Sequence, residues 1–145
     1  NEDGSKQLLC YHPNLKRILV LNSSLLENGE RRFVCQTFHT TKRQLSQVPL
    51  FAIDSKELLF EPISFAIQPQ SNELYLLSST GEVVILDQHG DLLSRHQLPE
   101  GISAPKLIHF TASGDLLATD ASTLHPVIMR LPWQKSHPDQ GPLVH

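Results

Sequence analysis

The stretch that most constrains the fold of this chain is residues 63–98, ISFAIQPQSNELYLLSSTGEVVILDQHGDLLSRHQL. It contains four short β-prone runs separated by clusters of Gly, Pro, Asn, Asp and Ser, which is the signature of strands joined by hairpins. No run is long enough for a typical helix. We therefore expect a four-stranded antiparallel meander, in which Gly90 of the last turn is free to take a positive φ.

The pattern inside the runs indicates how this meander is packed. The second and third runs, 74–77 and 83–86, are apolar at successive positions. Because successive side chains of a strand point to opposite faces of the sheet, both faces of these strands should be covered. The fourth run, 92–98, is mostly polar and suits an exposed outer edge. Covered inner strands and a wet outer strand are typical of one blade of a β-propeller.

The rest of the chain contains imperfect copies of the meander. The second strand of each copy begins at residue 17, 73 or 115, as RILVL, ELYLL and DLLAT, so the copies are separated by 56 and 42 residues. An interval of roughly 40–50 residues is typical of propeller blades. The longer first interval fits a polar loop at 22–31 and a polar connection at 40–47.

These copies predict an all-β fold with a defined set of elements. The first copy has expected strands at 7–11, 17–21, 32–39 and 49–54, and a helical turn at 55–60. The third copy has expected strands at 104–110, 116–119 and 126–131. The domain prediction is a partial β-propeller over 1–133, with blades at about 6–54, 62–99 and 104–133, and a Pro-rich tail at 134–145. Trp133 is expected to pack on a blade.

An arc of about three four-stranded blades does not close. Propellers typically have four to eight blades, so the arc would expose an apolar sheet face at each end. Such patches usually mark association surfaces. The expected partner is either the remaining blades of the propeller or a second copy of the chain, since two arcs of three would form a six-bladed ring.

Composition excludes some classes of partner. The net charge of the 145-residue chain is −3 and there is no basic run, so no nucleic-acid surface is expected. No apolar run approaches the roughly 20 residues that span a bilayer, so no transmembrane segment is expected. The sequence starts at Asn1 without a signal peptide, and an upstream segment is expected to be missing from it.

The two cysteines are predicted to stay unpaired. Cys10 lies on the first expected strand and Cys35 on the third, about 9–10 Å apart at the usual strand spacing. That separation exceeds the limit of roughly 7 Å for a disulfide, so we predict two free and mostly buried thiols. Cys10 and His12 share one strand face, a spacing able to chelate a metal. We favour a structural thiol beside a turn histidine, and no metal.

Three parts of the chain resemble successive blades of the bacterial SdiA-regulated family. They are QLLCYHP at 7–13 with RILVL, FEPISFAIQP at 60–69 with ELYLLS, and APKLIHF at 104–110 with SGDLL. The resemblance covers roughly residues 6–122. It implies a β-propeller of poorly defined function, exported to the periplasm or anchored outside the cytoplasm, of which this chain lacks the early blades.

One departure from the family pattern concerns binding. Family members often carry Glu-Gly at the head of the innermost strands, where this chain has Gln7-Leu8 and Lys106-Leu107. A cation or ligand site built on those glutamates would be weakened here, because Lys106 would repel a cation.

A candidate ligand site follows from propeller geometry. Ligands usually meet the ring where inner strands begin and second strands end. This rule pairs Gln7 with Asn22, Glu61 with Ser78, and Lys106 with Asp120. Such a set suits a small polar ligand or a peptide. The alternative is that these are ordinary turn residues that satisfy backbone groups.

The sequence favours binding over catalysis. It contains no nucleophile elbow, glycine-rich phosphate loop, His-x-x-x-His or Cys-x-x-Cys motif, and no cofactor is expected. We therefore expect a non-enzymatic binding or scaffold propeller. The alternative is a phytase-like phosphoesterase or another propeller hydrolase. A phytase-like enzyme needs clustered carboxylates for calcium and basic residues for phosphate, and the sequence shows neither cluster.

Overall fold

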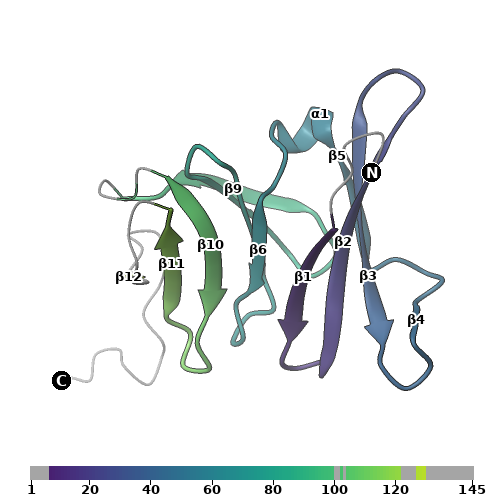
Figure 1. Ribbon diagram of the computed structural model, residues 1–145, viewed down its shortest axis with the longest axis horizontal. Helices are drawn as coiled ribbons and strands as arrows, with labels where there is room; N and C mark the ends of the chain where they lie inside the picture. The colour runs from purple at the N-terminus through teal and green to yellow at the C-terminus, as the bar shows by residue number, and fades with distance from the viewer. Residues whose placement is uncertain (1–6, 100–101, 103, 122–126, 130–145) are drawn as a thin grey trace.

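Three antiparallel sheets form an open arc. The computed structural model describes residues 7–99, 102, 104–121 and 127–129, and the side chains of 127–129 are not described. The sheets lie side by side, with their first strands β1, β6 and β10 adjacent and running in the same direction (Figure 1). The predicted all-β class and the open arc of antiparallel sheets are confirmed.

The first sheet has five strands instead of four. The strands β1, β2 and β3 are consecutive neighbours, and the outer position beside β3 is shared by β4 and β5. The bounds are β1 Gln7–His12, β2 Arg17–Leu25, β3 Arg31–His39, β4 Gln44–Leu45 and β5 Phe51–Asp54. Two predictions are corrected: the connection at 40–47 contains β4, and the strand expected at 49–54 begins at Phe51. β3 is nine residues long, which leaves room for two short partners.

The polar loop expected at 22–31 is also shorter than predicted. Four of its residues extend β2 to Leu25, and Arg31 begins β3. Asn22, Ser23 and Ser24 continue the register opposite Val34, Phe33 and Arg32. Polar side chains are tolerated there because the backbone pairing with β3 continues. The turn is limited to 26–30, where the Leu26 N–H donates to the Glu30 carbonyl.

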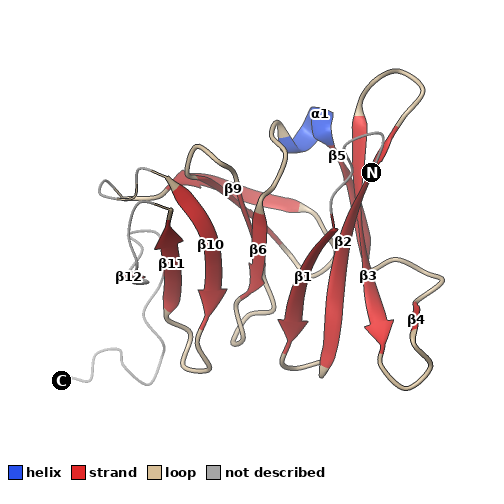
Figure 2. Ribbon diagram, viewed as in Figure 1, coloured by secondary structure: helices blue, strands red, loops and turns tan. Residues whose placement is uncertain are grey.

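The second and third sheets follow the predicted pattern (Figure 2). The second sheet holds β6 Ser64–Ile67, β7 Leu74–Leu77, β8 Glu82–Leu86 and β9 Leu92–Gln97, and the third holds β10 Pro105–Phe110, β11 Leu116–Asp120 and β12 Val127–Met129. Every residue of β6 and β7 is buried, whereas the outer strand β9 is half-exposed. The expected helical turn is α1 Ser55–Leu58, which links the first two sheets. Trp133 and the tail at 134–145 lie outside the described residues.

The core lies between the sheets in two layers. Between the first and second sheets, one layer packs the side chains of one face of each sheet, including Leu19, Leu21 and Phe33 against Phe65 and Leu76. Between the second and third, the other layer includes Tyr75, Leu77, Val83, Phe110 and Leu116. Tyr75 and Phe110 meet edge to face, with ring centroids 4.8 Å apart. The second sheet is therefore covered on both faces, as predicted.

Both cysteines face the first layer. Cys35 is buried on β3 and Cys10 is half-buried on β1, and both are free thiols. Burial raises the pKa of each thiol to about 12. At neutral pH both are therefore protonated and poorly nucleophilic.

The turns after β1 and β6 follow one pattern. In each, the first side chain accepts a backbone N–H from within the turn, His12 from Leu15 and Gln68 from Gln70, and a residue with positive φ, Lys16 or Asn72, donates its N–H to the carbonyl of that first residue. The turn after β10 is one residue shorter: Gly114, at positive φ, donates to the Thr111 carbonyl, and the Thr111 hydroxyl accepts the Asp115 N–H. Adjacent turns are also bridged, because Asn14 donates to the Pro69 carbonyl and Gln70 to that of Ala112.

We predict that His12 makes stability fall in mild acid. Burial lowers the pKa of His12, and its Nδ1 accepts the Leu15 N–H, which requires a neutral ring. The unfolded chain takes up a proton as pH falls below about 6.5, whereas the folded chain resists it. Stability due to neutral His12 is therefore present above that pH and lost below it. Urea unfolding at successive pH values measures the loss.

The matched variant for this prediction is His12→Gln. It places at the first turn the residue type that caps the equivalent turn at Gln68. We expect it to fold and to lose part of the acid sensitivity, with His96, whose pKa burial also lowers, supplying the remainder. An unchanged pH profile in His12→Gln would contradict the assignment.

Candidate functional site

The first end of the arc exposes apolar side chains at positions that are buried in the other two sheets. Leu9 and Tyr11 of β1 are 64% and 56% exposed. Matched through the pairing of each first strand with the second strand of its sheet, they are equivalent to two pairs of side chains that are each 3–6% exposed, Phe65 and Ile67 on β6, and Ile108 and Phe110 on β10. Those two pairs pack against the preceding sheet. Leu9 and Tyr11 therefore occupy packing positions that no sheet among the described residues covers.

We call this surface the first end face. Its other members follow from the strand register. On β2, Val20 is opposite Leu9 and Ile18 is opposite Tyr11. On β3, Phe38 is opposite Ile18. The first end face comprises Leu9, Tyr11, Ile18, Val20, Val34 and Phe38, together with Gln36 and Asn22, which the same register places opposite Val20 and Val34. Val20 is buried, so Leu9 and Tyr11 are the strongly exposed apolar side chains of a face that also carries polar groups.

The last end of the arc shows the complementary pattern. Leu107 is 51% exposed, and His109 is exposed beside it on β10. They are opposite Thr119 and Leu117 of β11. The positions equivalent to Leu117 and Thr119 in the second sheet are Tyr75 and Leu77, which are buried against the third sheet. Leu107, His109, Leu117 and Thr119 form the last end face, which no sheet in the described part of the chain covers.

Residues of both end faces line a hollow beside the first strands of the three sheets. Its volume is about 350 Å³, and it is lined by Leu9, Cys10, Ser64, Phe65, Leu107, Ile108, His109, Leu117 and Thr119. Leu9 comes from the first end face and four of the others from the last end face. We call it the axial hollow, because in a propeller the innermost strands surround the ring axis.

The polar groups of the axial hollow hold the strands together. The Ser64 hydroxyl accepts the Ile108 N–H and thus joins β6 to β10. The Thr119 hydroxyl accepts the Leu107 N–H, where the pairing of β10 with β11 is irregular. The Cys10 thiol is protonated at neutral pH because of its raised pKa. The hollow is therefore an apolar surface with His109 at its exposed side, suited to packing more than to acid–base chemistry.

The six ligand candidates from the sequence lie at one end of the strands, opposite the turns that follow β1, β6 and β10. Gln7 is paired with Asn22, and Pro105, next to Lys106, is paired with Asp120. Glu61 and Ser78 flank the paired residues Ser64 and Leu77. Gln7, Glu61 and Lys106 are exposed and Asn22 is half-buried, whereas Ser78 and Asp120 are each 3% exposed.

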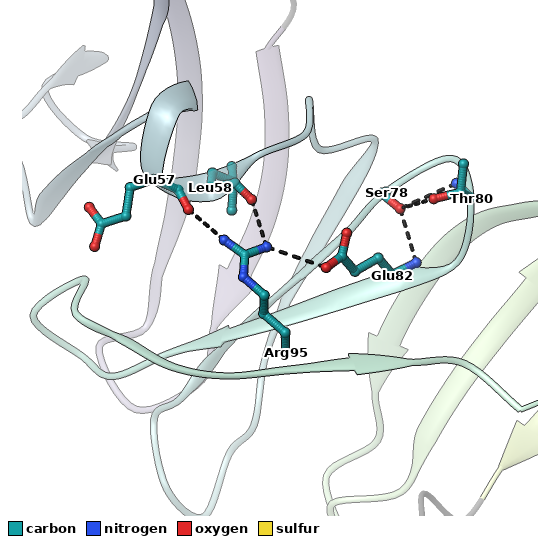
Figure 3. Close-up of polar contacts among 6 residues, drawn as sticks. All are labelled: Glu57, Leu58, Ser78, Thr80, Glu82 and Arg95. Atoms are coloured by element: carbon teal, nitrogen blue, oxygen red, sulfur yellow. Dashed lines mark hydrogen bonds and ion pairs between the residues drawn. The ribbon is translucent and has the colours of Figure 1, made fainter.

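Ser78 and Asp120 act in local structure. The Ser78 hydroxyl accepts the N–H groups of Thr80 and Glu82 and so shapes the turn between β7 and β8 (Figure 3). An Asp120 carboxylate oxygen accepts the Ala104 N–H at the entry to β10. For these two residues the turn interpretation explains the contacts. The remaining four stay a predicted polar rim.

The network around Ser78 continues to the link between the first two sheets. The Glu82 carboxylate accepts a hydrogen bond from Arg95 of β9 at 3.3 Å. The same guanidinium donates to the carbonyls of Glu57 and Leu58 in α1 (Figure 3). Arg95 therefore ties the helical link to the second sheet, and it satisfies carbonyls at the end of α1 that have no intrahelical partner.

We predict that Arg95→Met destabilises the protein by about 2 kcal/mol, since hydrogen bonds to charged groups each contribute about 1.5–3 kcal/mol. Arg32→Met is the control, because Arg32 pairs with Asp54 on the exposed surface, where ion pairs contribute little. Urea unfolding of both variants measures the difference. An equal loss of unfolding free energy in the two variants would show that Arg95 does not stabilise the link between the first two sheets.

The structure assigns no metal centre. Among the described residues, no group of three or more His, Cys, Asp or Glu side chains is placed to hold an ion. Cys10 and His12 share a strand face as expected, but His12 Nδ1 is engaged with the Leu15 N–H. In the described part of the chain, no helix is long and apolar enough to cross a membrane.

Sequence reasoning predicted apolar ends for the arc but did not name their residues. Part of the signal was present in the alignment of the copies. The interval of 56 residues aligns Leu9 and Tyr11 with Phe65 and Ile67, which are buried between the first and second sheets. The interval of 42 residues would align Phe65 and Ile67 with Leu107 and His109, whereas the strand pairing makes Ile108 and Phe110 their structural equivalents.

Comparisons with known proteins identify a fold and no family. No protein-family model and no curated protein matches the chain. A Bacteroides caccae protein of unknown function is similar in structure, with a TM-score of 0.57 and 15% identity over 91% of this chain and 44% of that one. This likeness shows a shared fold.

Two lyase structures are more distantly similar. Virginiamycin B lyase from Staphylococcus aureus gives a TM-score of 0.39 at 10% identity, covering 86% of this chain and 55% of that one. A streptogramin B lyase gives 0.43 at 12% identity, covering 90% and 55%. The chain spans about half the length of these three solved structures.

Proposed function

We propose that this protein is a non-enzymatic docking module whose two end faces bind further β-meander blades. One observation carries the proposal: Leu9 and Tyr11 are exposed at positions that are buried between blades in both other copies. Leu107 supports it from the other end of the arc. A partner sheet that presents apolar side chains to these faces would cover them as the internal sheets cover one another.

The physical reason for docking is the cost of exposed apolar area. Each fully buried Leu or Phe side chain contributes about 1.5–3 kcal/mol relative to exposure. The two end faces expose three large apolar side chains, Leu9, Tyr11 and Leu107. Exposed apolar patches on soluble proteins usually mark interaction sites. The predicted rim of Gln7, Asn22, Glu61 and Lys106 would then lie at the edge of the docked assembly, where a small polar ligand or peptide would bind.

Anilinonaphthalene sulfonate, which fluoresces on apolar surfaces, tests the docking proposal together with sedimentation of the same sample. We expect one of two results. In the first, the chain is associated and the probe binds weakly. In the second, the chain is monomeric and the probe binds strongly, and the double variant Leu9→Asp with Leu107→Asp abolishes the strong binding. A folded monomer that binds no more probe than this double variant would refute the proposal.

The proposal also predicts a lack of phosphoesterase activity. We expect no calcium-dependent hydrolysis of nitrophenyl phosphate by the purified chain. Turnover that a chelator abolishes would favour the phytase-like alternative and overturn the non-enzymatic assignment.

We further propose an exported bacterial protein of the SdiA-regulated type. This rests on the blade-opening motifs at 7–13, 60–69 and 104–110. Fractionation of cells expressing the native gene tests it, with the protein expected outside the cytoplasm. Recovery in the cytoplasm would contradict this location and leave the docking proposal untouched.

A further inference from the structure

We propose that the partner is a second copy of this chain, and that two arcs close into a six-bladed ring around a two-fold axis. The inference rests on the proposed docking function of the end faces. It goes beyond that function because it specifies the partner, the pairing of the faces and the symmetry.

The last end face and the first end face carry the two sets of positions that pack against each other at the interfaces between sheets within the chain. Within the chain, each interface between two sheets is formed by two sets of side chains. One set comes from the face of a sheet that points toward the next sheet, and the other comes from the face of the next sheet that points back. Leu8 and Cys10 of β1, for example, pack on the layer that contains Phe65 and Ile67. The last end face offers Leu107 and His109, equivalent to Leu8 and Cys10. The first end face offers Leu9 and Tyr11, equivalent to Phe65 and Ile67.

A second copy satisfies both faces with one type of contact. Its last end face covers the first end face of the first copy, and the reverse contact is formed by symmetry. Head-to-tail contacts of this kind generate a closed ring when the rotation permits. An unrelated partner would need two different complementary faces, one for each end of the arc.

The size of the similar fold agrees with two copies. The 91% of this chain that aligns with the Bacteroides caccae protein makes up 44% of that protein, which is therefore roughly twice as long. Two arcs of three sheets give six blades, within the usual range of four to eight.

A charge-pair exchange tests the pairing of the faces. Leu9→Asp places a carboxylate on the first end face, and Leu107→Lys places an ammonium on the last. Each variant alone disrupts both contacts of a homodimer, and we expect its dissociation constant to rise at least about 100-fold, because an unpaired charge is buried. Mixing the two variants leaves one native contact and pairs Asp with Lys in the other, so a dimer should reappear.

The readout is the mass of the full chain by sedimentation, with unfolding curves to verify the fold of each variant. Both leucines are exposed in a single chain, so neither change removes buried packing within it. Leu93→Asp is the control, because Leu93 is 50% exposed on the outer strand β9 and lies on neither face. We expect it to stay dimeric.

The remaining outcomes separate this inference from the docking function. A wild-type chain that is a folded monomer and binds the apolar probe would overturn the second copy and retain docking to another partner. A dimer that one variant breaks and the other does not, or a mixture that stays monomeric, would overturn head-to-tail pairing. An open polymer larger than a dimer would overturn ring closure.

Discussion

Gly90→Ala is expected to lower the free energy of unfolding by about 3 kcal/mol. Gly90 lies in the turn between β8 and β9 at φ +90°, a backbone conformation that costs an L-residue about 1–2 kcal/mol. A Cβ at this position would also lie 2.3 Å from Cβ of Phe51 on β5. Such overpacking typically costs about 1–3 kcal/mol. Equilibrium unfolding in urea measures the sum.

Gly29→Ala is the matched control. Gly29 has φ +86°, but an added Cβ would meet no atom within 4 Å. The Gly29→Ala variant has the backbone strain but not the steric clash. The difference in unfolding free energy between the two variants therefore measures the contact of the Gly90 turn in the second sheet with Phe51 in the first. Equal losses in the two variants would show that the turn at Gly90 does not pack on Phe51.

Leu76→Ala is expected to destabilise the protein by about 3–5 kcal/mol, the upper range for Leu truncation in a core. Leu76 is fully buried in β7, the inner strand of the sheet covered on both faces. Removal of its side chain opens a cavity that neighbouring rigid strands cannot fill. Because all three sheets depend on this one, we expect a single unfolding transition to shift as a whole, followed by far-UV and near-UV circular dichroism.

Leu93→Ala provides the comparison, since Leu93 is half exposed on β9 and should cost less than about 1 kcal/mol. If Leu76→Ala produced two separate transitions, the sheets would be independent units rather than a stack. If it matched Leu93→Ala, the assigned core would be wrong.

The sequence predicted the central sheet closely because local and long-range signals agree there. The apolar runs at 74–77 and 83–86 required cover on both faces, and both strands are buried. Gly90 takes the expected positive φ. The first sheet was predicted less well, because Asn22, Ser23 and Ser24 are loop-forming types by composition and are held in β2 only by pairing with β3.

The six polar candidates lie at one end of the strands, and their role in ligand binding stays a prediction. However, turn chemistry and ligand chemistry use the same residue types, and only the folded structure shows that Ser78 and Asp120 accept backbone N–H groups. The end faces could not be recognised by residue type at all, since Leu9 and Leu107 look like core residues until the missing neighbour is considered.

Sedimentation of the unmodified chain over a wide dilution range tests the central claim most directly. On the proposal that the two end faces pack against the blades of a second copy, we predict a species of twice the 16.3-kDa chain mass that dissociates only on strong dilution. A folded chain that sediments at 16.3 kDa at every concentration would contradict a ring closed by two copies.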